Sequence, residues 1–287
     1  MNNSPFKILE TDAKQILSPT SGFIAKAGFT HSLTPARNCT FGCTYCYVPT
    51  LRFHAGLKRD DWEHWGRWST FKMNAAELLA MELRSNQVIY CSPLTDPYQP
   101  AEREKAIMPG ILAAVLEAPP QVFVIQTRSL LILRDLDLLL KLARQTALRV
   151  SFSITTNREQ IRRWYEPLCS PIAERLDVVR RLNDAGIATH ITIAPILPCD
   201  PAELVDMALQ ASGRDLIGDP LHVRESKPNG AVTRKGAGRI SQKRGFLEWH
   251  DPAFMAGVID AMRAAAARRG HRFEIGSPAF GWLATRS

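Results

Sequence analysis

Three cysteines lie within eight residues of the chain, at Cys39, Cys43 and Cys46 in the run NCTFGCTYCY. Closely spaced thiolates are typical ligands of zinc or of an iron–sulfur cluster. A structural zinc ion needs four ligands, so His31 or His54 would have to complete the set. A four-iron cluster also normally takes four thiolates, so three cysteines would leave one iron open to a different ligand. The motif therefore predicts either a zinc site or a cluster with an open coordination position.

The elements that must position these thiols alternate along the chain. Apolar β-branched runs predict strands, and segments of helical period predict helices between them. The strands are expected at residues 87–93, 121–127, 148–155, 187–197, 221–226 and 271–276, and the helices at residues 74–85, 102–118, 129–146, 173–186, 201–212 and 251–270. This order predicts an α/β fold of βαβ units with a parallel sheet, which five or six units would curve into a barrel. The carboxyl ends of such strands carry the chemistry.

The cysteine spacing, with three and then two residues between the thiols, resembles that of the radical S-adenosylmethionine (SAM) superfamily. There, three cysteines hold a 4Fe–4S cluster, and the amino and carboxylate groups of SAM bind the fourth iron. The resemblance implies that Cys39, Cys43 and Cys46 are cluster ligands, and that flavodoxin or ferredoxin supplies electrons. It also implies a partial (β/α)6 barrel over residues 30–225, between an N-terminal extension (1–29) and a C-terminal region (226–287).

Two further features favour one branch of that superfamily. Tyr45 and Tyr47 flank Cys46, and Cys91 closes the strand expected at 87–93, in the run VIYCSPLTDPYQPAE. This combination resembles the spore photoproduct lyase-like family, whose enzymes reverse a methylene-bridged thymine dimer in DNA. The resemblance implies hydrogen abstraction from the dimer, fragmentation, and return of a hydrogen atom from Cys91. Tyr45 and Tyr47 would pass the radical back to 5′-deoxyadenosine. The alternative for Cys91 is a buried cysteine of the core.

Polar residues at the carboxyl ends of the expected strands are candidates to hold SAM. By the same resemblance, Arg128 is placed to meet the SAM carboxylate, since it follows the strand at 121–127. Ser151 or Ser153, on the next strand, would reach the ribose. Thr95 or Asp96 would receive the amino group. Structural alternatives remain open, because Arg128 could cap a helix and the serines could be sheet hydroxyls.

The net charge of +8 is concentrated in one stretch, because residues 221–250 hold seven basic residues and two acidic ones. Glycines punctuate residues 226–245, which predicts a loop or hairpin outside the barrel wall. Its candidate phosphate contacts are Arg234, Lys235, Arg239, Lys243 and Arg244. A dimer in duplex DNA must be extruded to reach a barrel interior, and a basic segment would hold the backbone. The alternative is a solvated surface loop.

Composition excludes several classes of protein. Apolar residues make up 45% of the chain, which allows a sizeable core. No run approaches the roughly 18 apolar residues of a membrane span, and the first residues lack the pattern of a signal peptide. We expect a cytoplasmic monomer with no membrane partner, whose six cysteines stay reduced. Cys169 and Cys199 are expected to be structural.

The leading hypothesis is a radical SAM lyase that repairs a thymine photoproduct in DNA. A second hypothesis is a radical SAM enzyme that modifies tRNA or a peptide, with Cys91 as a radical relay. A third is a zinc-stabilised nucleic-acid-binding protein without catalytic activity. Anaerobic reconstitution with iron and sulfide separates the third hypothesis from the other two, because only a radical enzyme cleaves SAM on reduction.

Overall fold

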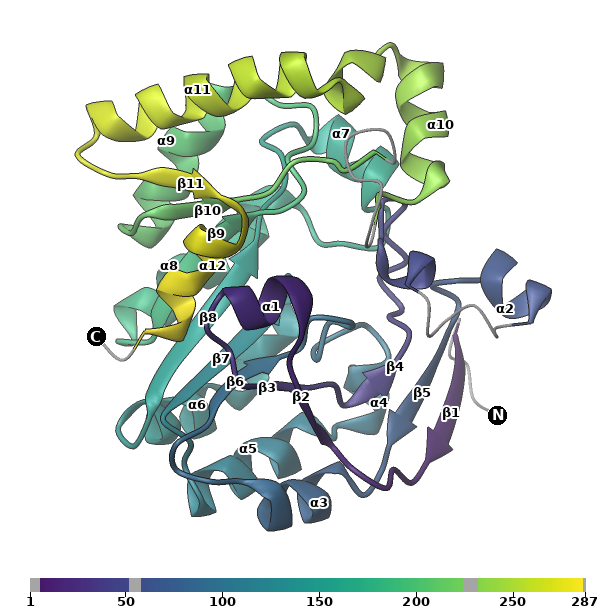
Figure 1. The fold of residues 1–287 in the computed structure, drawn as a ribbon, viewed down its shortest axis with the longest axis vertical. Coiled ribbons are helices and arrows are strands. Elements are labelled where there is room, and N and C mark those ends of the chain that lie inside the picture. Colours follow the sequence, from purple (N-terminus) through teal and green to yellow (C-terminus); the bar gives the residue numbers. More distant parts are fainter. Residues whose placement is uncertain (1–5, 52–57, 224–231, 286–287) are drawn as a thin grey trace.

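The computed structural model describes residues 6–51, 58–223 and 232–285. Its main feature is a curved sheet of eight strands in the order β11-β10-β9-β8-β7-β6-β3-β2 (Figure 1). Strands β3 to β11 of this sheet run parallel, and β2 is antiparallel to β3. The strands are β2 (Leu17–Pro19), β3 (His31–Leu33), β6 (Val88–Cys91), β7 (Val122–Thr127), β8 (Ala147–Ser153), β9 (Ala188–Ile193), β10 (Leu216–Gly218) and β11 (Phe273–Ile275).

Strands β2 and β11 are the two edges of this sheet, so within the described residues it curves without closing on itself. The prediction of an α/β fold with a partial barrel is therefore confirmed. A second sheet has the order β1-β5-β4, with β1 (Lys7–Thr11), β5 (Trp68–Lys72) and β4 (Ala36–Arg37). The division of the chain into three regions at residues 30 and 225 stays a prediction. The main sheet includes strands from all three of these regions.

Helices cover both faces of the main sheet, with α3, α5 and α6 on one face and α1 and α12 on the other (Figure 1). On the first face, Ile89 and Ile125 pack in the large core that includes Leu112 of α5. On the second face, Tyr90 packs in a smaller core with Phe280 of α12. The α-helices are α1 (Gly22–Lys26), α2 (Arg59–Glu63), α3 (Ala75–Glu82), α4 (Glu102–Lys105), α5 (Met108–Glu117), α6 (Leu136–Ala143), α7 (Glu159–Tyr165), α8 (Ile172–Asp184), α9 (Pro201–Ser212), α10 (Lys235–Arg244), α11 (Pro252–Arg268) and α12 (Gly276–Gly281).

Short 3-10 helices complete the described elements, namely η1 (Val48–Thr50), η3 (Leu130–Asp135), η4 (Leu247–His250) and η5 (Trp282–Ala284). Local sequence signals explain where the best-defined helices begin. The Asp200 carboxylate accepts a hydrogen bond from the Glu203 N–H at 3.0 Å and caps α9. Asp251 caps α11 in the same way through the Phe254 N–H at 2.8 Å. In both helices a proline follows the cap, where its missing N–H costs nothing.

The strand expected at 221–226 is wrong for residues 221–223, because the strand of this region is β10, a few residues earlier. Residues 221–223 lie in a loop, in which the His222 N–H donates to the Thr233 hydroxyl at 2.9 Å. Residues 224–226 fall outside the described part of the chain. The short strand Leu216–Gly218 ends in a glycine, so its strand signal is weaker than that of the later run.

Residues 235–244 of the basic segment form helix α10, so the prediction of a loop or hairpin is wrong for these residues. Helix α10 includes Gly236 and Gly238 and ends at Gly245, whose φ of 75° is in the left-handed region. Ala237 and Ser241 are fully buried one turn apart, so packing outweighs the poor helix propensity of the glycines. Residues 226–231 lie outside the described residues.

None of the helices in the described part of the chain combines the length and the apolar character that crossing a membrane requires.

Candidate functional site

The cysteine loop, residues 38–47, follows β4 and lies at the carboxyl edge of the main sheet. Its backbone is set by two glycines. Gly42 has a φ of 58°, in the left-handed region that favours glycine. A methyl group at Gly66 would come within 2.4 Å of the Gly42 Cα, so the two backbones can approach only without side chains. The loop is also anchored at Thr40, whose N–H donates to the Gln99 side-chain carbonyl at 2.8 Å.

The structure brings the three cysteines of the motif together on this loop as free thiols. Cys43 is buried, whereas Cys39 and Cys46 are partly exposed. Burial raises the pKa of Cys39, and the nearby charge of Asp96 raises it further. Burial raises the pKa of Cys46 to about 11. The pKa of Cys43 is lowered, because a hydrogen bond from Cys169 stabilises its thiolate against the effect of burial.

The spacing of the thiols distinguishes between the two kinds of metal centre. Two sulfurs bound to one zinc ion can be at most about 4.6 Å apart, because each Zn–S bond is about 2.3 Å long. Among the described residues, the sulfurs of Cys39, Cys43 and Cys46 do not all lie within 4.8 Å of one another, and of the three only Cys43 belongs to such a group, with Glu166 and Cys169. His31 is at the opposite, amino end of β3, and His54 lies outside the described residues. The loop therefore fits a larger cluster better than a single ion.

Beside the loop lies a buried ionic network centred on Glu166, a residue that sequence analysis did not select. Oε1 of Glu166 accepts hydrogen bonds from Arg128 Nη1 at 2.6 Å, from the Thr155 hydroxyl at 2.9 Å and from the Tyr45 hydroxyl. Oε2 accepts from Arg175 Nη1 at 2.7 Å. Burial alone would raise the pKa of Glu166, but the charges of Arg175 and Arg128 bring it down to about 2. The carboxylate is therefore ionised at neutral pH.

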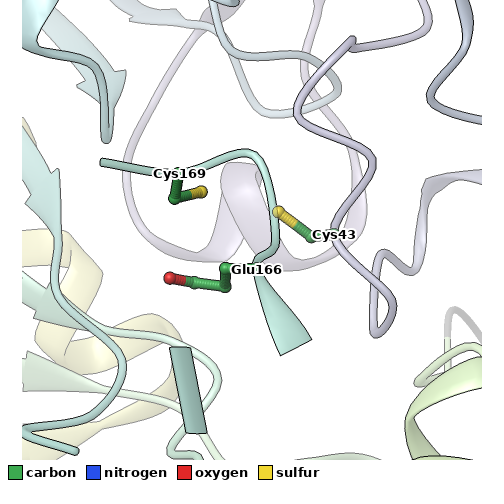
Figure 2. Close-up of side chains that lie close together, drawn as sticks. All are labelled: Cys43, Glu166 and Cys169. Carbon is green, nitrogen blue, oxygen red and sulfur yellow. The ribbon is translucent and has the colours of Figure 1, made fainter. Parts of the chain in front are cut away.

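Helix α7 brings this network to the loop. The Tyr165 carbonyl, at the end of α7, accepts hydrogen bonds from the Thr44 N–H at 3.0 Å and the Thr44 hydroxyl at 3.1 Å. The turn after α7 carries Glu166 and Cys169 toward Cys43, and the three ligand atoms lie within 4.8 Å of one another (Figure 2). From the sequence, Cys169 is expected to be structural and no helix is predicted at 159–165. No local signal could have found the pair, because it forms only when α7 docks on the loop.

Arg128 follows β7 as predicted, and its side chain reaches the cysteine loop. Its Nη1 donates to the Cys43 sulfur at 3.4 Å and to the Tyr45 hydroxyl. Its backbone N–H donates to Asp96 Oδ2 at 2.9 Å. Asp96 also accepts from the Thr127 hydroxyl at 2.7 Å, so its carboxylate already supports the loop that carries Arg128. Thr95, the other candidate for the amino group of SAM, precedes Asp96 in the chain. Its hydroxyl oxygen lies 3.3 Å from that of Ser92.

Ser151 and Ser153 are buried on the inner face of β8, within a polar group centred on Gln126. The Ser151 hydroxyl donates to Gln126 Oε1 at 2.8 Å, and Gln126 Nε2 donates to the Ser153 hydroxyl at 2.8 Å. Tyr90 of β6 also donates to Gln126 Oε1. The serines are thus partly sheet hydroxyls, as the structural alternative predicted, and Gln126 is the half-exposed group through which they would meet a ligand.

The two tyrosines of the motif face different surroundings. Tyr45 is buried and belongs to the Glu166 network. Tyr47 is 40% exposed, and its hydroxyl donates to the Pro93 carbonyl at 2.5 Å. Burial of its hydroxyl group raises the pKa of Tyr47, as do the nearby Cys46 and Asp219, the residue that follows β10. Tyr47 therefore lies between the loop that follows β6 and the residue that follows β10.

Cys91 ends β6 and packs in the same large core as Cys43 and Tyr45 of the cysteine loop. It is fully buried, and it pairs across the sheet with Leu33 of β3 and Ile125 of β7. These partners belong to the core under α5, whereas Tyr90, the preceding residue, faces α12. Since successive side chains of a strand point to opposite faces, the sulfur points into the outer helix layer. The donor role inferred for Cys91 stays a prediction.

Helix α10 packs with its first turn directly against the cysteine loop. The Arg234 N–H donates to the Tyr45 carbonyl at 3.3 Å, and a methyl group at Gly236 would lie 2.9 Å from the Thr44 carbonyl oxygen. The Arg234 side chain is partly buried and close enough to Cys46 to interact electrostatically. Arg244 stacks on Trp164, with its guanidinium carbon 4.3 Å from the ring centroid. Lys235, Arg239 and Lys243 are exposed at intervals of four residues, along one face.

The fold and site define an α/β enzyme with a thiol-rich loop at the carboxyl edge of a partial parallel barrel. The Radical SAM superfamily model matches residues 33–210, and the chain belongs to that superfamily. Enzymes of this superfamily use a 4Fe–4S cluster and SAM. Zinc in place of a cluster, the third hypothesis, is therefore wrong.

The relatives by sequence are uncharacterised. The chain is 31% identical over 214 residues to protein Rv2578c of Mycobacterium tuberculosis, which covers 69% of this chain and 60% of the relative. It is 27% identical over 205 residues to protein MJ0683 of Methanocaldococcus jannaschii, which covers 71% of this chain and 72% of the relative. The match thus spans less than two thirds of the mycobacterial protein's length.

Solved structures share the fold. A spore photoproduct lyase variant is similar with a TM-score of 0.62 and 15% identity, over 93% of this chain and 81% of the other. A second variant, with bound AdoMet and dinucleoside spore photoproduct, has a TM-score of 0.60 and 14% identity over the same shares. Identity this low shows a common fold and leaves the substrate of this chain open.

Proposed function

We propose that this radical SAM enzyme acts on nucleic acid, with reversal of a thymine photoproduct as its reaction. The observation that carries the proposal is the position of α10. A polyanion bound along Lys235, Arg239 and Lys243 would lie on a helix whose first turn contacts the cysteine loop. Helix α10 would then hold the substrate backbone, and the adjoining cysteine loop would hold the radical source. The likeness in fold to a lyase bound to a dinucleoside photoproduct supports the lesion as the substrate.

In this proposal Cys39, Cys43 and Cys46 hold the cluster, and the cluster and SAM together supply a 5′-deoxyadenosyl radical. The chain's own groups orient and shield that chemistry. The Glu166 network fixes the Arg128 guanidinium beside Cys43, so Arg128 can meet a carboxylate only from one side. Buried Trp65, Trp68 and Val48 pack next to Cys46 and exclude water there. Tyr47 and Gln126 are partly exposed polar side chains near the carboxyl edge of the sheet, where a substrate base would enter.

The test is anaerobic reconstitution with iron and sulfide, followed by reaction with SAM, dithionite and a synthetic dinucleotide photoproduct. We expect a four-iron cluster, formation of 5′-deoxyadenosine and release of repaired thymines. The Cys39→Ala, Cys43→Ala and Cys46→Ala variants should each lose the cluster and 5′-deoxyadenosine formation. Full SAM cleavage in any of the three would refute the ligand assignment. Flavodoxin or ferredoxin should replace dithionite.

A second candidate is radical modification of tRNA or a peptide in a form that does not use Cys91 as the relay, and the position of Cys91 favours this form over the lyase reaction. The lyase reaction needs a hydrogen atom returned to the product, and the thiol inferred for that step faces the helix layer. Abundant 5′-deoxyadenosine without repair of the dinucleotide would select this candidate. The basic helix α10 would then bind the phosphate backbone of tRNA. The same reconstituted enzyme can be tested with tRNA as the substrate.

A further inference from the structure

Cys43 differs from the other two cysteines of the loop in its surroundings. Its sulfur accepts a hydrogen bond from Arg128 Nη1 at 3.4 Å, and the Cys169 sulfur points toward it from the turn after α7 (Figure 2). Cys43, Glu166 and Cys169 are all buried, and their ligand atoms lie within 4.8 Å of one another. The group lies on the side of the loop next to β7 and β8, away from Cys46 and its tryptophans.

Two thiols and a carboxylate this close together are a typical set of metal ligands. The contacts of Glu166 nevertheless exclude a second metal ion here. Both oxygens of Glu166 already accept charge-assisted hydrogen bonds, from Arg128 at 2.6 Å and from Arg175 at 2.7 Å. Two buried guanidinium groups would repel a cation at this point. Glu166 instead acts as an anchor, because it holds Arg128 against Cys43.

Cys169 is held just as firmly. Arg162 Nη1 donates to the Cys169 carbonyl at 2.6 Å and to the Glu166 carbonyl at 3.3 Å, and the Cys169 N–H donates to the Glu166 carbonyl at 3.0 Å. The Arg162 side chain is itself 8% exposed and paired with Glu159 at 2.5 Å. The turn is therefore a rigid support, and the thiol of Cys169 is presented to Cys43 by backbone contacts that no cofactor has to supply.

Hydrogen bonds to a cluster's sulfur ligands stabilise its more negative, reduced form and raise its reduction potential. We propose that Cys169 and Arg128 donate hydrogen bonds to the sulfur of Cys43 in the loaded enzyme and thereby raise the reduction potential of the cluster. Cys169 is then a positioning and tuning residue for the electron transfer that starts the reaction. The inference rests on the proposed function through one assignment, that of Cys43 as a cluster ligand.

The experiment compares three variants of the reconstituted enzyme: Cys169→Ala, Cys169→Ser and Cys199→Ala. Cys169→Ala removes the donor, and Cys169→Ser retains one in a hydroxyl group. Cys199→Ala is the matched control, because Cys199 is an equally buried thiol. Iron and sulfide content is measured first, and the midpoint potential then follows from a redox titration monitored by electron paramagnetic resonance. The couplings of exchangeable protons to the reduced cluster are compared in H2O and D2O.

We expect Cys169→Ala to lower the ratio of reduced to oxidised cluster by about threefold to tenfold at a fixed solution potential, the effect of one hydrogen bond. A tenfold change corresponds to about 59 mV for one electron. Cys169→Ser should restore the potential, Cys199→Ala should leave it unchanged, and one exchangeable-proton coupling should vanish in Cys169→Ala alone. If Cys169→Ala does not retain a cluster, the test rests on Cys169→Ser, which should keep both the wild-type potential and the proton coupling.

Equal potentials and proton couplings in Cys169→Ala, Cys199→Ala and the wild type would overturn the inference. So would a Cys169→Ser enzyme that holds a cluster but lacks the coupling and has a lowered potential. A wild-type protein that binds no cluster fails differently, because it removes the assignment of Cys43 and with it the proposed function. The iron content of the wild type therefore separates the two failures before any potential is measured.

Discussion

At the scale of single residues, Glu166 has the largest energetic consequence in the site. It is a fully buried carboxylate between two guanidinium groups, and its pKa is lowered to about 2. A depressed carboxyl pKa contributes stability at every pH above the unfolded value of about 4.5, and this contribution is lost as the pH falls toward 2. The difference amounts to about 3 kcal/mol.

Glu166→Gln removes the carboxylate that pairs with Arg128 and with the fully buried Arg175. We expect the free energy of unfolding of the apoprotein to fall by about 3–5 kcal/mol at pH 7, as measured by urea denaturation. Below pH 4.5 the gap to the wild type should narrow, because the carboxyl group of Glu166 is then protonated in the unfolded state while it is still ionised in the folded state. Glu274→Gln breaks an exposed pair with Arg263 and should cost less than about 1 kcal/mol. Similar losses in the two variants would contradict the buried-network account.

Cys91 is the second residue whose position decides a prediction. Because its sulfur packs under α5, Cys91→Ala should leave a small cavity that costs about 1–2 kcal/mol of stability. The distribution of products from the dinucleotide photoproduct should match that of the wild type and of Cys199→Ala, as measured by chromatography. If Cys91→Ala alone gave thymine products trapped as adducts of added sulfite in place of repaired thymines, Cys91 would be the hydrogen donor after all.

At the scale of elements, the contact between α10 and the cysteine loop requires glycine at one position. A methyl group at Gly236 would lie 2.9 Å from the Thr44 carbonyl oxygen, whereas one at Gly238 would meet no atom within 4 Å. The backbone of α10 or of the loop must shift to accept a side chain at Gly236. The two glycines belong to the same helix, so they form a matched pair.

Gly236→Ala should destabilise the protein by about 1–3 kcal/mol through this overlap, and it should reduce the iron retained after reconstitution. Gly238→Ala should raise stability by up to about 1 kcal/mol, because alanine is the better helix former and the space is open. Urea denaturation and iron content measure the two effects. A stabilised Gly236→Ala variant with full iron content would show that α10 does not press on the loop.

At the scale of the whole molecule, charge is the property that bears on the partner. Arg234 and Arg244, two of the five predicted phosphate contacts, also support the fold, one beside Cys46 and the other on Trp164. Lys235, Arg239 and Lys243 are exposed along one face of α10, whereas Arg244, which is also exposed, stacks on Trp164. Neutralising these three tests nucleic-acid binding without disturbing the site. Monomeric state and cytoplasmic location stay predictions.

Replacing Lys235, Arg239 and Lys243 by glutamine should weaken binding to DNA and flatten its salt dependence. The slope of log K against log salt should fall by about 0.9 for each phosphate that no longer meets a cationic side chain. Turnover of a free dinucleotide should be retained. Arg103, Arg180 and Arg181 are exposed on other elements, and their replacement by glutamine is a control with the same change in charge. Equal losses in both triple variants would show a general effect of net charge.

The sequence by itself determined what is local along the chain. The cysteine motif lies within eight residues, and the alternation of strands and helices follows from patterns a few residues long, so both were predictable. The location of Arg128 at a strand end followed from the same alternation, because parallel strands bring their carboxyl ends to one edge.

Only the tertiary structure decided contacts between distant segments. Tyr45 and Glu166 are 121 residues apart, and neither shows in its own surroundings that the other will be its partner. The face on which Cys91 lies depended on strand register, since a shift of one residue reverses every side chain. Helix α10 forms despite its glycines, because the burial of Ala237 and Ser241 stabilises it. Local helix propensity does not include this tertiary stabilisation.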